Sequence, residues 1–131
     1  MVFVDSSALV AMLANEDDGG ALAARLGDFA ESTTSSIVIY ETVLALCRIR
    51  RAPLFDMQAV VQEFLRRAGV RVVEIEADEH VGALGAHARL GKGTGHAAGL
   101  NLGDCFSYAI AKRLGVPLLY KGEDFVHTDL R

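Results

Sequence analysis

The feature that most constrains the fold is the alternation of short β-type segments with longer helical segments. The predicted strands are residues 2–4, 33–36, 70–75 and 116–120, and the predicted helices are residues 8–13, 21–29, 37–51, 56–68, 78–90 and 102–114. No tight hairpin sequence joins any two strands, so the strands are expected to run parallel, with helices on both faces. The sequence therefore predicts an α/β fold, a three-layer α/β/α sandwich with a mainly parallel sheet.

Several polar, proline and glycine residues mark the expected ends of these helices. Ser6 or Ser7 can cap the first helix, and Asp56 can cap the fourth. Pro53 ends the helix over residues 37–51, and Gly115 ends the last helix. Residues 91–99 contain no helical or strand pattern, and we expect a loop there.

Length and composition predict one globular domain over residues 1–131. The chain has 131 residues and 51% apolar residues, which is enough for a hydrophobic core. Neither a membrane-spanning run nor a signal peptide is apparent, so we expect no membrane association and a cytoplasmic location. The two cysteines have no zinc-binding spacing. A net charge of −4 disfavours a protein that coats nucleic acid non-specifically.

Four acidic residues lie on or beside apolar elements. Asp5 follows the strand over residues 2–4, and Asp124 closely follows the last strand. Glu41 lies on an apolar stripe of its helix, and Asp104 lies in the first turn of the helix over residues 102–114. Acids in such places are unfavourable unless a partner compensates their charge.

Each acid also has a structural alternative. Asp5 can be a helix cap, Glu41 can form an ion pair with Arg48, and Asp104 can interact with the helix dipole. Asp124 can belong to a solvated turn, and Glu123 can replace it as the functional acid.

The carboxyl ends of parallel strands share one edge of the sheet, so Asp5 and Asp124 are expected to meet there. Carboxylates gathered about 4 Å apart repel by about 4 kcal/mol per pair at an effective dielectric near 20. A divalent cation is the simplest compensation, and ligands that are all oxygen favour Mg²⁺ or Mn²⁺. The pattern indicates metal-assisted hydrolysis of a phosphodiester.

The chain resembles the PIN-domain ribonucleases, and among them the VapC toxins of bacterial toxin–antitoxin pairs. The resemblance covers nearly the whole chain and rests on the opening VFVDSSALVAML, the helix around Tyr40-Glu41-Thr42, the segment LNLGDCFSYAIAKRLGVPLLYKGEDF and the tail HTDL. It implies a PIN-like sandwich, a single acidic site that holds Mg²⁺ or Mn²⁺, and endonucleolytic cleavage of RNA.

The resemblance also assigns roles to individual residues and implies partners. Asp5, Glu41, Asp104 and Asp124 match the four family acids, and Ser7 matches a hydroxyl residue beside the first acid. Many relatives have Thr or Ser just after the fourth strand, whereas this chain has Lys121, a cation that could partly neutralise the site. The implied partners are a VapB-like antitoxin and a second copy of the chain in a homodimer.

Three basic or imidazole side chains are candidates for contact with RNA. Arg48 follows Glu41 on the same helix, and Lys92 and His96 lie in the loop over residues 91–99. A solvated surface position is the alternative for each. The letters of a dinucleotide-binding motif at residues 93–98 follow a predicted helix and not a strand, so we reject that motif.

Two other functions fit part of the pattern. A PIN-like binding protein without activity would have the same fold. A phosphoryl-accepting receiver domain would explain the length, the α/β alternation and a lysine after the last strand. It would also need paired acids after the first strand, where this chain has Asp5 and then Ser6.

Overall fold

The computed structural model describes residues 1–122 and 124–130 and contains a four-stranded parallel sheet. Its strands are β1 (Val2–Val4), β2 (Ser32–Thr34), β3 (Val70–Val72) and β4 (Leu118–Leu119), in the order β3-β2-β1-β4. Each neighbouring pair is parallel, with Val2 opposite Ser32, Phe3 opposite Leu118, and Ser32 opposite Val70. The prediction of a parallel sheet is confirmed.

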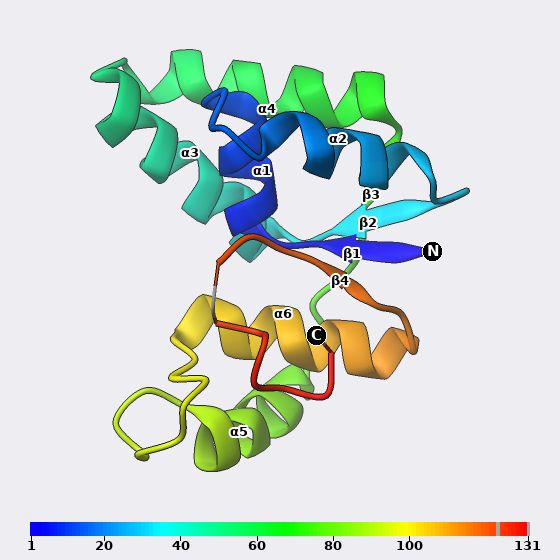
Figure 1. Cartoon of the computed structure of the whole chain (residues 1–131), viewed down its shortest axis with the longest axis vertical. Helices are drawn as coiled ribbons and strands as arrows, with labels where there is room; N and C mark the ends of the chain where they lie inside the picture. The colour runs from blue at the N-terminus through cyan, green and yellow to red at the C-terminus, as the bar shows by residue number, and fades with distance from the viewer. Residues whose placement is uncertain (123, 131) are drawn as a thin grey trace.

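Helices cover both faces of this sheet (Figure 1). On one side lie α1 (Ser6–Leu13), α2 (Gly19–Gly27), α3 (Ser36–Arg50) and α4 (Leu54–Ala68), and on the other lie α5 (Glu79–Leu90) and α6 (Leu102–Leu114). The two helical layers sandwich the strands, so the predicted three-layer α/β/α architecture is confirmed. No helix within the described residues is long and apolar enough to cross a membrane.

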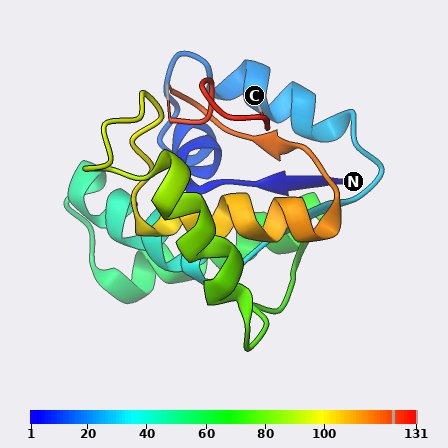
Figure 2. The same cartoon turned by 90° about the horizontal axis from the view of Figure 1, so that it is seen from below.

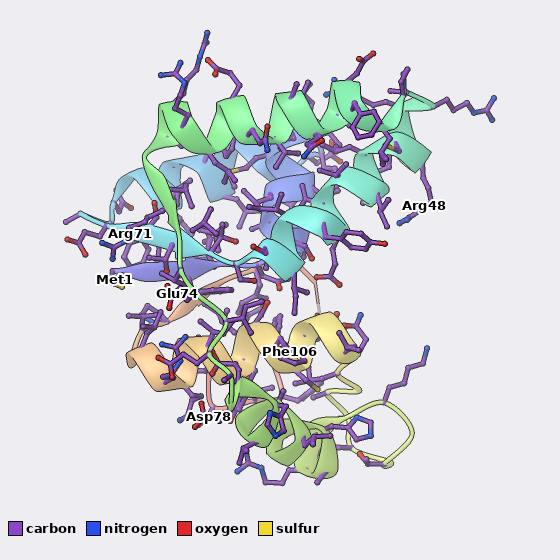
Figure 3. The ribbon with its side chains drawn as sticks, turned by 180° about the vertical axis from the view of Figure 1, so that it is seen from behind. Met1, Arg48, Arg71, Glu74, Asp78 and Phe106 are labelled. Carbon is purple, nitrogen blue, oxygen red and sulfur yellow. The ribbon has the colours of Figure 1, made fainter. Side chains whose placement is uncertain are left out.

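The core lies where the central strands meet the helices. Phe3, Leu9, Leu46, Ile110 and Leu119 are all fully buried and come from β1, α1, α3, α6 and β4. Burial of one such side chain contributes about 1.5–3 kcal/mol relative to an exposed position. The first residues of α1, α3 and α6 are thereby held beside the sheet. Figure 3 shows the opposite side of the molecule, with Phe106 on α6 and Arg48 at the far end of α3.

Most predicted boundaries differ from the structure by one to three residues, and three of the differences have a clear local cause. Asp5, and not Ser6 or Ser7, caps α1, because its side chain accepts a hydrogen bond from the Ser7 amide. Pro53, and not Asp56, occupies the position before α4, and Asp56 lies inside the first turn. The predicted strand over residues 33–36 begins and ends earlier, because the Ser35 hydroxyl caps α3 by accepting from the Val38 amide.

The chain order places a topological switch between β1 and β4. From β1 the chain adds β2 and then β3 on one side, and it then returns to add β4 on the other side of β1. Figure 2 shows that β1 and β4 run in the same direction. In open parallel sheets, ligands bind beyond the carboxyl ends of the strands at such a switch.

The C-terminal segment is attached to α6. Asp129 accepts a hydrogen bond from the Tyr108 hydroxyl at 2.5 Å and forms a 2.6 Å ion pair with Lys112. Phe125 is buried and packs at a tilted angle against Tyr120, with ring centroids 5.3 Å apart. These contacts hold the segment that contains Asp124 against the end of the sheet.

Candidate active site

Asp5 occupies the carboxyl end of β1 and has two different carboxylate oxygens. Oδ2 accepts hydrogen bonds from the Ser7 amide at 3.1 Å and from the Ser7 hydroxyl at 2.8 Å. Oδ1 is buried and has no hydrogen-bond partner within the described residues. Burial raises the pKa of Asp5, and its hydrogen bonds to Ser7 oppose that rise. The capping alternative is thus correct for one oxygen, and the other remains available to a ligand.

Asp104 is held at the start of α6 by a capping box. Its amide donates to the Asn101 side chain at 2.9 Å, and its Oδ2 accepts from the Asn101 amide at 3.1 Å. Burial raises the pKa of Asp104 to about 7, with further contributions from the negative charges of Asp5, Asp124 and Glu41. These electrostatic contributions place all four acids in one neighbourhood.

Glu41 reaches the same place from α3. Burial raises its pKa, the charge of Asp5 raises it further, and a hydrogen bond from Ser6 opposes the rise. The carboxylate lies against the backbone of Gly103, where an added Cβ atom would overlap it. No ion pair joins Glu41 to Arg48 in the part of the chain that the structure describes. The ion-pair alternative for Glu41 therefore finds no support.

Asp124 completes the group from the segment after β4. Its side chain is exposed, and its charge contributes to the raised pKa of Asp104. Glu123, the alternative fourth acid, lies outside the described residues. Among the described residues after β4, Asp124 is an acid whose charge acts on Asp104.

Lys121 forms its ion pairs with two acids outside the group of four. Its ammonium forms ion pairs with Glu16 at 3.1 Å and with Asp18 at 3.2 Å, both in the α1–α2 connection. Its backbone amide donates to the Ser7 hydroxyl at 3.0 Å, and this hydroxyl donates to Asp5. The lysine side chain thus faces the α1–α2 connection, while its backbone supports Ser7 and through it Asp5.

Ser107 is a site residue that the sequence reasoning did not select. It lies one turn after Asp104, its hydroxyl is buried without a hydrogen-bond partner of normal geometry, and it lowers the pKa of Asp5. A small polar residue three positions after an acid, on an otherwise apolar helix face, was the available signal. Asn101 and Gly103 were also missed, because their roles depend on contacts with Asp104 and Glu41.

The donors at this site suit a hard divalent cation that keeps part of its water shell. Within the described residues, no three carboxylate, imidazole or thiolate side chains are already arranged as direct ligands of one metal ion. Mg²⁺ commonly binds through one or two carboxylates and several waters, so a full set of protein ligands is not required. A bound cation would give Oδ1 of Asp5 a partner and would lower the raised pKa of Asp104.

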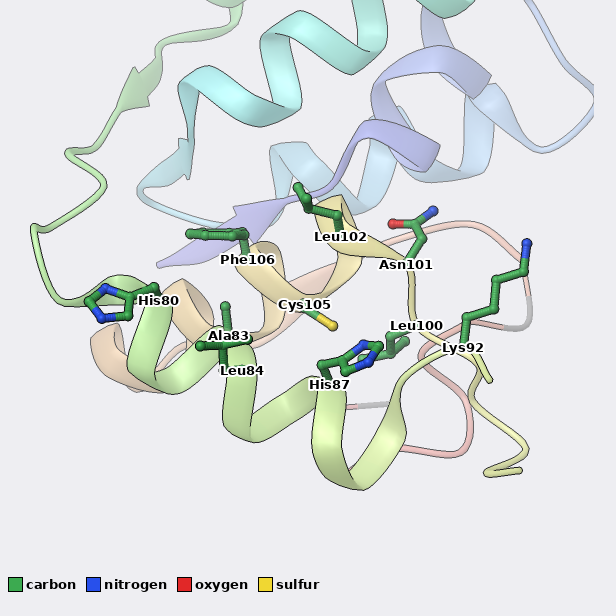
Figure 4. A pocket seen from close by; sticks show the side chains of 10 residues that line it. All are labelled: His80, Ala83, Leu84, His87, Lys92, Leu100, Asn101, Leu102, Cys105 and Phe106. Atoms are coloured by element: carbon green, nitrogen blue, oxygen red, sulfur yellow. The ribbon is translucent and has the colours of Figure 1, made fainter. Parts of the chain in front are cut away.

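The three RNA-contact candidates lie in different places. Arg48 is exposed on the wall of a groove of about 420 Å³ that Glu41, Ser6 and Ser7 also line. Lys92 lines a different groove between α5 and α6, together with His87 and Leu84 (Figure 4). The His96 ring accepts a hydrogen bond from the Ala98 amide within the loop. Among these candidates, Arg48 alone shares a groove with a site acid.

Comparison with known proteins agrees with this geometry. The PIN domain family matches residues 2–130. A VapC ribonuclease from Rhizobium meliloti is 42% identical over 141 aligned residues, which cover 99% of this chain and 99% of the relative. The ribonuclease VapC42 from Mycobacterium tuberculosis is 37% identical, and the alignment covers 99% of this chain and 97% of VapC42. VapC30 from the same organism is 41% identical, and the alignment covers 97% of this chain and 94% of VapC30.

A solved structure shows the same fold. The crystal structure of Mycobacterium tuberculosis VapC20, described as a toxin that cleaves the sarcin–ricin loop, superposes with a TM-score of 0.79. The superposition covers 100% of this chain and 97% of the VapC20 chain, with 22% sequence identity. This match excludes the receiver-domain alternative as a description of the fold. The chain belongs to the PIN-domain family and, within it, to the VapC ribonucleases.

Proposed function

We propose that this protein is the toxin of a toxin–antitoxin pair and an endoribonuclease that hydrolyses RNA with Mg²⁺ or Mn²⁺. The observation that carries the proposal is the convergence of Asp5, Glu41, Asp104 and Asp124 beyond the carboxyl ends of β1 and β4. Membership of the VapC ribonucleases supports RNA as the substrate. Residues 1–131 form a single nuclease domain in this proposal.

The four acids are the proposed metal-binding residues. A bound divalent cation would lower the pKa of the attacking water and offset the charge that builds on the phosphate. Asp5 presents the free Oδ1, because Ser7 holds the other oxygen. Asp104 is fixed by its capping box, so its carboxylate does not have to be ordered when the substrate binds.

Glu41 is the proposed proton acceptor. Its carboxylate is half-buried, its pKa is raised, and it lies at the boundary between the acids and the open groove. A carboxylate with a raised pKa takes a proton from an attacking water more readily near neutral pH. Gly103 allows this position, since any side chain there would displace Glu41.

Arg48 is the proposed phosphate contact. It lies on the groove that Glu41 lines, and its guanidinium can bind a phosphate through two parallel hydrogen bonds. Lys92 and His96 are secondary candidates, because the groove of Lys92 does not contain a site acid and the His96 ring is engaged within its own loop.

The proposed partners are a VapB-like antitoxin and a second copy of the chain, and the proposed location is the cytoplasm. The antitoxin would place a C-terminal segment over the acids, with a basic side chain near them. An acidic group with no ion-paired cation among the described residues favours such a contact electrostatically.

The test compares growth after induction of the wild-type chain, Asp104→Asn and Asp56→Asn at matched expression. Asp56 is an exposed acid of α4 and serves as a control for the loss of one negative charge. We expect growth arrest with wild type and Asp56→Asn only, together with RNA cleavage in vitro that EDTA abolishes and Mg²⁺ restores. Equal growth in all three strains and no cleavage of pooled cellular RNA would favour an inactive PIN-like binding protein.

A further inference from the structure

Two large apolar side chains are exposed directly beside the acidic group. Tyr40, on α3, is 67% exposed, and Leu102, on α6, is 71% exposed. They line one open groove of about 550 Å³, which also contains Glu41 and Gly103. Large apolar side chains gathered at an open surface commonly mark a binding site.

We propose that this groove binds an unpaired base of the RNA substrate, stacked on the ring of Tyr40. The proposal rests on the endoribonuclease function, because Glu41 belongs both to the acidic group and to this groove. A strand whose phosphate lies at the acids can therefore place a neighbouring base beside Tyr40. Proteins that bind single-stranded RNA commonly stack its bases on exposed aromatic rings.

The charge of the protein favours a contact that does not depend on phosphate attraction. The net charge is −4, and four acids gather where the scissile phosphate must lie. Electrostatic attraction to phosphates, which usually supplies most non-specific affinity, is correspondingly weak. Stacking is independent of charge, so it can hold the strand at an acidic site.

Two polar groups in the same groove can read the edge of the base. The Asn101 oxygen accepts from the Asp104 amide, which leaves the NH₂ group of this side chain to donate to a ligand. The hydroxyl-bearing Ser36 is exposed on the α3 side. In Figure 4, Asn101 and Leu102 project from the start of α6 away from α5. A flat ring beside two hydrogen-bonding groups fits a base better than a purely apolar ligand.

A protein segment is the competing occupant. Tyr40 also lines a second groove of about 410 Å³, between α3 and α4, with Leu54 and the 75%-exposed Phe55. This second groove contains none of the four acids, so a protein segment could occupy it without approaching the site. Because Tyr40 and the site acid Glu41 line the first groove together, we assign the base to that groove.

The test combines a ring-removing substitution with removal of single bases. Tyr40→Leu keeps an apolar side chain but removes the aromatic face, and Phe55→Leu is the matched control in the second groove. Both residues are mainly exposed, so neither substitution should disturb folding. The substrate is a short single-stranded RNA around a mapped cleavage site, with an abasic nucleotide placed at each position in turn.

We expect Tyr40→Leu to lower kcat/KM by roughly 5- to 150-fold, the range for loss of one base–aromatic stack, with no effect of Phe55→Leu. An abasic nucleotide at one position should lower kcat/KM of the wild type by a similar factor. The same nucleotide should lower kcat/KM of the Tyr40→Leu variant almost no further. Unchanged cleavage by Tyr40→Leu, or losses that multiply, would overturn the proposal. A variant that is defective only in antitoxin binding would equally overturn it and identify a protein-docking surface.

A binding measurement separates this inference from the nuclease function. The Asp104→Asn protein, with Tyr40 or with Tyr40→Leu, is titrated with labelled oligoadenylate and oligouridylate. Stacking predicts tighter binding of oligoadenylate and a loss of that preference with Tyr40→Leu, whether or not the wild type cleaves RNA. The same preference in both proteins would refute the role of Tyr40 independently of catalysis.

Discussion

Replacement of Asp104 by Asn should remove a pH-dependent loss of stability from the metal-free protein. The pKa of Asp104 is raised from 3.8 to about 7 in the folded chain, so the folded state holds the proton more tightly than the unfolded state does. Stability from this group is therefore present at low pH and is lost as the pH rises towards the folded pKa. Between about pH 5 and about pH 8 the wild type should lose about 3 kcal/mol through this carboxyl.

Urea unfolding in EDTA, at these two pH values, measures the effect. Asn retains an oxygen for the capping box but carries no charge, so Asp104→Asn should lack this part of the pH dependence. The difference between the two slopes measures Asp104 together with its electrostatic coupling to the neighbouring acids. Parallel pH profiles, or a variant that is less stable than wild type at about pH 8, would refute the reasoning.

Divalent metal provides the second half of this test. If the acids bind Mg²⁺, the cation offsets the repulsion in the wild type and should raise its unfolding free energy near pH 8. The same addition should stabilise Asp104→Asn much less, because one ligand charge is missing. Equal stabilisation of both proteins would place the metal elsewhere.

Three further substitutions test individual contacts. Gly103→Ala should displace the Glu41 carboxylate and lower RNA cleavage by roughly tenfold or more while far-ultraviolet circular dichroism is unchanged; retained cleavage would mean that Glu41 can move without loss. Ser7→Ala should leave Asp5 Oδ2 without its hydroxyl donor and lower the unfolding free energy by about 1–2 kcal/mol, with weaker Mg²⁺ binding measured by calorimetry; Ser7→Thr should retain both. Lys121→Met removes ion pairs whose side chains are 35–46% exposed and should cost at most about 1 kcal/mol in urea unfolding; a larger cost, or greater activity, would show that the lysine acts on the acidic group.

Local sequence was sufficient for the order of elements and for the fold class. The helix over residues 102–114 was predicted with the observed bounds, and Gly115 is a strong local signal for its end. Other ends were less well predicted. The start of α4 was misplaced because Pro53 fits the position before a helix as readily as Asp56 fits a cap. The strand predicted over residues 70–75 ends at Val72, which is 47% exposed because β3 lies at the edge of the sheet.

The acids themselves could be selected from the sequence, because a carboxylate on an apolar element is conspicuous wherever it occurs. Their convergence followed in part from the parallel topology, which brings the ends of β1 and β4 together. The arrangement of their neighbours did not follow, since each contact joins residues far apart in the chain.

The sequence by itself determined that strands alternate with helices, that the sheet is parallel, and which carboxylates belong beside it. These properties depend on local propensity and periodicity, which act over a few residues. Tertiary structure alone decided that Lys121 forms ion pairs with Glu16 and Asp18. It also decided that Glu41 lies against Gly103 and that Tyr40 lines the same groove as Glu41. These properties depend on distances between separate elements, which are set only when the two helical layers pack against the sheet.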